Sequence, residues 1–147
     1  MGLSEPVRPQ HVPQPTLPAQ SAEHGMLQRY VRLLSGLNGL RSCCVFDIAS
    51  GARLAHSGNA HSAAELGRQG QSLLFTMLAA GKALGSGAAI PEAAVTLGAH
   101  HLLLRGVPRH PEAVLHAVFD KATANLTLAR LQVLRLDALF EEAPHGA

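Results

Sequence analysis

The chain has 147 residues, of which 47% are hydrophobic and 15% are charged. This length and composition predict one domain with its own core and exclude a chain that is disordered throughout. Twelve basic and ten acidic residues leave a formal net charge of +2, and the chain has no Trp and one Tyr. Because the arginines are scattered and aromatic rings are few, we expect no nucleic-acid-binding surface.

Residues 1–22 contain five prolines, separated by mostly polar residues. Proline lacks a backbone N–H and restricts the residue before it, so we expect neither a helix nor an inner strand in this segment. The composition predicts a disordered Pro-rich tail over 1–22, a folded domain over 23–142 and a flexible C-terminus over 143–147. No secretory signal or membrane-spanning run is recognisable, so we expect a cytoplasmic protein.

The first part of the domain predicts a helix followed by a β-hairpin. Apolar residues recur at helical spacing over 26–37, and Asn38-Gly39 ends the helix. Residues 40–48 and 52–57 predict two strands around a turn at 49–51. The adjacent Cys43 and Cys44 are expected to face opposite sides of the first strand, as unpaired small apolar residues.

The middle of the chain predicts a long helix over about 63–84. Ser62 is a candidate N-cap, with Glu65 three residues later in the capping-box pattern. A narrow stripe of mostly small side chains recurs every three or four residues: Ala63, Gly67, Gly70, Leu74, Met77 and Gly81. Such a stripe lets another backbone come close. The pattern leaves open whether that backbone is the chain's own sheet or the middle helix of a second copy.

The last part predicts three strands, over 92–97, 100–105 and 114–119, and a final helix that Asn125 caps. The third of these strands is densely apolar and is therefore expected to be central. A loop is expected over 106–111. Short links between strands favour an antiparallel sheet, and the number of apolar faces requires helices on both sides of it. The predicted fold is thus α+β, an α-β-β-α-β-β-β-α sandwich of three layers.

Residues suited to catalysis or metal binding do not form a recognisable motif. The sequence lacks a phosphate-binding GxxxxGK[ST] loop, a GxSxG elbow and paired carboxylates. Histidine is abundant, but His56, His61, His100 and His101 follow none of the compact spacings of metal ligands. We therefore expect no enzyme, cofactor or metal site. A histidine-based metalloenzyme is the least favoured alternative.

Three stretches, over 43–58, 92–107 and 113–131, resemble the Roadblock family (dynein light chain roadblock-type domain) in their order and local pattern. The likeness covers about residues 26–139 and is greatest to bacterial members that regulate a gliding-motility GTPase. The matching positions are Asp47, Gly51, Gly58, Asp120, Asn125 and Arg130. Thr127 departs from the pattern, because the family often has Gly at that position.

The resemblance implies a sheet in the order 2-1-5-4-3, with the middle helix on one face and the terminal helices on the other. It also implies homodimers that pair their third strands and place their middle helices side by side. On this reading the dimer interface comprises the small-residue stripe together with Ala93, Val95 and Leu97.

The function that the resemblance implies is that of a non-catalytic regulator or scaffold that binds a small Ras-like GTPase. The alternative is a ligand-binding or sensor module of similar fold, which predicts a closed apolar pocket and no GTPase partner. Arg68, Arg105 and Arg109 are expected to be solvated surface residues.

Overall fold

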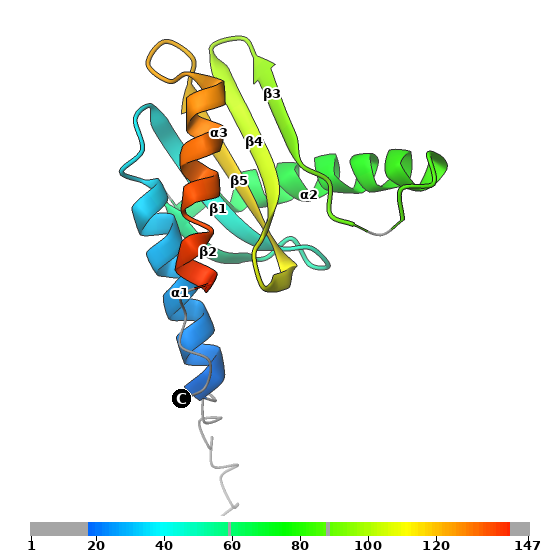
Figure 1. Cartoon of the computed structure of the whole chain (residues 1–147), viewed down its shortest axis with the longest axis horizontal. Helices are drawn as coiled ribbons and strands as arrows, with labels where there is room; N and C mark the ends of the chain where they lie inside the picture. Colours follow the sequence, from blue (N-terminus) through cyan, green and yellow to red (C-terminus); the bar gives the residue numbers. More distant parts are fainter. Residues whose placement is uncertain (1–17, 59, 88, 142–147) are drawn as a thin grey trace, which may run out of the picture.

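A five-stranded antiparallel sheet lies between two layers of helices in the computed structural model, which describes residues 18–58, 60–87 and 89–141 (Figure 1). The strand order is β2-β1-β5-β4-β3, as the resemblance implied. The elements are α1 (Pro18–Leu34), β1 (Leu40–Asp47), β2 (Arg53–Ser57), α2 (Ala60–Ala83), β3 (Ala93–Leu97), β4 (His100–Val107), β5 (His110–Asp120), α3 (Leu126–Arg135) and α4 (Ala138–Glu141).

The central strand is β5, as its dense apolar sequence predicted, and it pairs with β1 and β4. The loop expected over 106–111 is wrong in extent, because β4 continues to Val107 and β5 already begins at His110. Pro108 and Arg109 form the turn, and Arg109 adopts the left-handed conformation with φ of 62°. Pairing between the strand ends therefore replaces most of the expected loop.

Two hydrophobic clusters hold the layers on the sheet. One is shared by α1, α3 and α4 and includes Tyr30, Phe119 and Phe140. The other lies beneath α2 and includes Phe46 and Leu74. The prediction for the two cysteines is confirmed, because Cys43 belongs to the first cluster and Cys44 to the second.

Two helix starts differ from the expectations. Helix α1 begins at Pro18, inside the segment where no helix was expected, because a first-turn position needs no backbone N–H donor. The rest of the predicted tail, residues 1–17, lies outside the described residues. Helix α2 begins at Ala60, so Ser62 lies in its first turn and is not the N-cap.

The final apolar segment forms two helices, not one. Asn125 caps α3 as predicted, and its side-chain oxygen accepts a hydrogen bond from the Leu128 backbone N–H at 2.9 Å. After Leu136 the chain turns into the short α4, which places the Phe140 ring 5.0 Å from that of Tyr30. Among the described residues, no helix combines the length and hydropathy that a bilayer crossing requires.

Candidate functional site

One edge of the sheet is the most prominent apolar surface of the described structure. Strand β3 is an edge strand that pairs with β4 through Ala93↔Leu104, Val95↔Leu102 and Leu97↔His100. Cross-strand partners share a face, and Leu104 belongs to the cluster beneath α2. Val95 and Leu97 therefore lie on the α2 face of the sheet, and Leu97 is 57% exposed.

Helix α2 projects past this edge (Figure 1). Its 24 residues give a length of about 36 Å, whereas five strands span about 20 Å between their outer axes. The part beyond the sheet has little of its own chain to pack against. In the second half of α2, Met77 and Leu78 are half-buried against the cluster beneath the helix, whereas Phe75 is exposed. Leu84, just after the helix, is 82% exposed.

The small-residue stripe divides between these two halves of α2. Ala63, Gly67, Gly70 and Leu74 are buried against the sheet of their own chain. A Cβ at Gly67 would lie 2.9 Å from the Gly51 carbonyl oxygen, and one at Gly70 would lie 2.7 Å from the Phe46 ring. The close contacts of Gly67 and Gly70 are therefore intramolecular, and the assignment of these four residues to a dimer interface stays a prediction. Met77 and Gly81 are only half-buried and remain candidates.

A groove of about 510 Å³ runs beside the buried half of α2. It opens to solvent over the part of the sheet that α2 leaves uncovered. Its lining includes Arg41 and Ser42 of β1, Glu65 and Gln69 of α2, and Leu97, His100 and Leu102 near the β3 edge. The sensor hypothesis required a closed apolar pocket, and this groove is open and partly polar.

The thiols and histidines do not assemble a reactive centre in the described part of the chain. Burial raises the pKa of the Cys43 thiol and raises that of Cys44 to about 12, so both thiols are protonated at neutral pH. His100 and His101 project to opposite faces, and His101 shares a hydrogen bond of 2.8 Å with Thr96. No group of three or more metal-ligating side chains occurs among the described residues.

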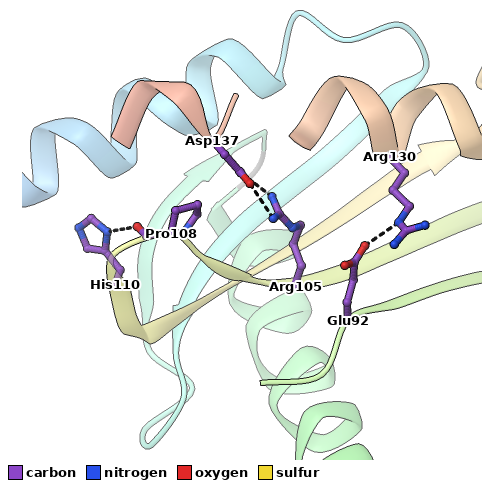
Figure 2. A network of polar contacts seen from close by, with 6 residues as sticks. All are labelled: Glu92, Arg105, Pro108, His110, Arg130 and Asp137. Atoms are coloured by element: carbon purple, nitrogen blue, oxygen red, sulfur yellow. Dashed lines mark hydrogen bonds and ion pairs between the residues drawn. The ribbon is translucent and has the colours of Figure 1, made fainter. Parts of the chain in front are cut away.

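The three arginines differ in their surroundings. Arg105 is not a solvated surface residue, because it donates two hydrogen bonds to the Asp137 carboxylate at 2.6 and 2.9 Å and is mostly buried (Figure 2). This ion pair fixes the turn between α3 and α4. Arg68 is exposed and pairs with Glu65 one helical turn away, and Arg109 is exposed at the β4–β5 turn.

The positions shared with the Roadblock pattern have structural roles. Asp47 accepts hydrogen bonds from the backbone and hydroxyl of Ser50, which shapes the β1–β2 turn. Gly51 and Gly58 have positive φ, and a Cβ at Gly51 would lie 2.6 Å from the Gln71 side chain. The Asp120 carboxylate accepts from the Ala122 N–H, and Asn125 caps α3. Arg130 pairs with Glu92 at 2.6 Å, which links α3 to the start of β3 (Figure 2).

The sequence-based reasoning missed two exposed apolar groups. Phe75 and Leu84 are exposed and lie outside the small-residue stripe. The available signal was that this segment has more apolar residues than one helical face can hold. Leu128, Leu131 and Leu134 of α3 are exposed and face outward. Their spacing of three residues was the available signal there.

Comparison with known proteins identifies the fold. No protein-family model matches the sequence. No curated protein matches it either. Among solved structures, a Roadblock/LC7 domain from Streptomyces avermitilis superposes with a TM-score of 0.66 at 14% identity, over 78% of this chain and 93% of that one.

Two structures of MglB superpose on this chain with the same TM-score. MglB of Myxococcus xanthus has a TM-score of 0.66 at 18% identity, over 80% of this chain and 86% of its own. The gliding protein MglB of Thermus thermophilus has a TM-score of 0.66 at 22% identity, over 83% of this chain and 93% of its own. The fold of the chain is therefore the Roadblock/LC7 fold, and the resemblance drawn from the sequence is confirmed at that level.

Proposed function

We propose that this chain, with its Roadblock/LC7 fold, is a non-catalytic homodimeric regulator or scaffold that binds a small Ras-like GTPase. The observation that supports the dimer is the free outer edge of the apolar strand β3, which lies beside the projecting half of α2. The GTPase partner rests on the sequence resemblance to bacterial gliding-motility regulators, with which the likeness to MglB structures agrees.

The dimer follows from the physical requirements of an edge strand. Free N–H and C=O groups along β3 favour pairing with another strand, and pairing with the same strand of a twin closes a twofold assembly. The projecting half of each α2 would then lie over the uncovered β3 and β4 of its twin. Phe75 supplies an exposed apolar side chain for that contact, beside the half-buried Met77 and Leu78, and the groove beside Leu97 and Leu102 would receive it.

The dimer is tested by measuring the molar mass of the full chain by light scattering after size exclusion at micromolar concentration. We expect twice the mass of one chain for the wild type and the mass of one chain for Leu97→Asp. Leu33→Asp is the matched control, because Leu33 is 42% exposed on α1, far from β3 in the fold. A monomeric wild type would reject the proposal, and a dimeric Leu97→Asp would place the interface elsewhere.

The GTPase partner is tested by affinity capture from a lysate of the source organism, once with GDP and once with a non-hydrolysable GTP analogue. A regulator favours one conformation of its partner, so we expect a small GTPase to be retained in one nucleotide state only. If no GTPase is captured in either nucleotide state, the GTPase partner is contradicted and only a scaffold role remains.

A further inference from the structure

Helix α3 is apolar on two sides, and only one of them is covered. Its inward residues Ala129 and Val133 are buried against the sheet. Its outward residues Leu128, Leu131 and Leu134 are 49%, 48% and 37% exposed and recur every three residues. Exposed leucines that recur along one helical face form an apolar surface of the kind that marks a protein–protein contact.

A groove of about 190 Å³ extends this leucine face toward the sheet edge. It lies between α3 and β3, and its lining consists of Ala94, Leu126, Thr127, Arg130, Leu131 and Leu134. The Arg130–Glu92 ion pair spans from α3 to the residue that precedes β3 (Figure 2). The leucine face and the groove beside it together suit an amphipathic helix, whose apolar residues recur every three or four positions.

The charged residues of helix α3 itself are all basic. Helix α3 contains Arg130 and Arg135 and has no acidic residue. Arg130 donates to Glu92 through Nε, and Arg135 has no ion-pair partner among the described residues. A second copy of α3 would place arginines opposite arginines, which disfavours self-association here. The chemistry therefore fits a partner whose leucine-type anchors are flanked by Asp or Glu.

We propose that the leucine face of α3 and its groove bind an acidic amphipathic helix of a partner protein. This surface lies on the face of the sheet opposite α2 (Figure 1), and its groove borders the edge strand β3 through Ala94. Neither the dimer nor the GTPase is needed to infer this site. A membrane surface is the less favoured occupant, because the face lacks Trp and Tyr and offers only two arginines.

The probe is a fluorescent peptide of about four helical turns, with Leu on one face and Glu on either side of that face. The control peptide has Lys in place of each Glu. Binding to the full chain is measured by fluorescence anisotropy. We expect the Glu peptide to bind at least tenfold more tightly than the Lys peptide, more weakly as salt increases. Leu131→Glu should weaken binding at least tenfold, and Arg135→Glu about threefold.

The matched controls are Leu33→Glu and Arg29→Glu on α1, which replace an equally exposed leucine and an exposed arginine away from the groove. Both should bind the Glu peptide like the wild type. No binding of the Glu peptide, equal binding of both peptides, or unchanged binding by Leu131→Glu would overturn the proposal. If the protein does not bind the Glu peptide but co-sediments with phosphatidylserine vesicles, the leucine face would be assigned to membrane binding.

Discussion

At the scale of single residues, the glycines of α2 show how closely a helix approaches this sheet. Gly67 faces the backbone of the β1–β2 turn, and Gly70 faces Phe46 and His116. Glycine inside a helix costs about 1 kcal/mol relative to alanine. The cost is offset here because a Cβ at either position would push α2 away from the β1–β2 turn or from the buried Phe46 and His116.

Gly70→Ala is expected to lower the free energy of unfolding by about 1–3 kcal/mol, because overpacking against a buried ring is not relieved by solvent. Gly25→Ala is the control. It lies in α1 with nothing within 4 Å of its Cβ position, and should raise stability by about 1 kcal/mol. Urea unfolding followed by circular dichroism measures both. An unchanged Gly70→Ala would show that α2 shifts freely on the sheet.

His116 is the buried titratable residue beneath α2. Its Nδ1 donates to the Leu66 carbonyl at 3.0 Å, and its Nε2 is buried without a hydrogen-bond partner among the described residues. Burial lowers the pKa of this imidazole below its ordinary value of 6.5. The folded state therefore favours the neutral ring.

Because the unfolded chain binds this proton at a higher pH than the folded chain does, stability should decrease as pH falls below about 6.5. His116→Asn keeps a donor for Leu66 and removes the titration, so its stability should depend less on pH between 7.5 and 5. Thr127→Ala, which removes no titratable group and is exposed, is the control and should keep the wild-type slope. Equal slopes for all three proteins, from urea midpoints, would contradict this role of His116.

At the scale of elements, side-chain contacts fix where the helices of the last segment begin and end. Asn125 satisfies a backbone N–H in the first turn of α3. Arg105 of β4 holds Asp137 beyond the last turn and so sets the direction in which α4 leaves. One contact is local, and the other joins residues 32 positions apart in the sequence.

Asn125→Ala should destabilise the chain by about 1 kcal/mol, because a first-turn N–H of α3 loses its acceptor. Thr127→Ala is the control, since Thr127 is exposed in the same turn and does not cap it. Its effect should stay within about 0.5 kcal/mol. Thermal unfolding measures both. Equal losses would contradict a specific contribution of the Asn125 cap.

At the scale of the whole molecule, both hydrophobic clusters depend on the same central strands. β1 contributes Cys43 and Val45 to one cluster and Cys44 and Phe46 to the other. Neither layer of helices can lose its sheet contact without exposing a fully buried strand. We therefore expect the two layers to unfold together.

The two cysteines report on this cooperativity, because one lies in each cluster and both are fully buried. Labelling by a thiol reagent should be slow in native protein and should accelerate with urea equally in Cys43→Ser and Cys44→Ser, once corrected for their unfolded-state rates. An exposed thiol in a short peptide gives the unprotected rate. Faster labelling of Cys44 than of Cys43 would show that α2 opens by itself.

The sequence by itself determined the number of strands and their order along the chain, though not the full extent of β4 and β5. It also determined the cap of α3, the opposite directions of the two cysteines and the central place of β5. These follow from alternation, turn residues and local hydrogen bonds, which neighbours along the chain already specify. The resemblance added the strand order, because the whole pattern of elements is characteristic.

Only the tertiary structure decided what faces the small-residue stripe. A sheet of the same chain and a helix of a second copy would both need a residue without a Cβ at the point of close approach. The tertiary structure likewise joined Arg105 to Asp137, which nothing in their local sequence indicated. It also divided α2 into a covered and an uncovered half. That division depends on helix length and sheet width together, and no local pattern contains the second quantity.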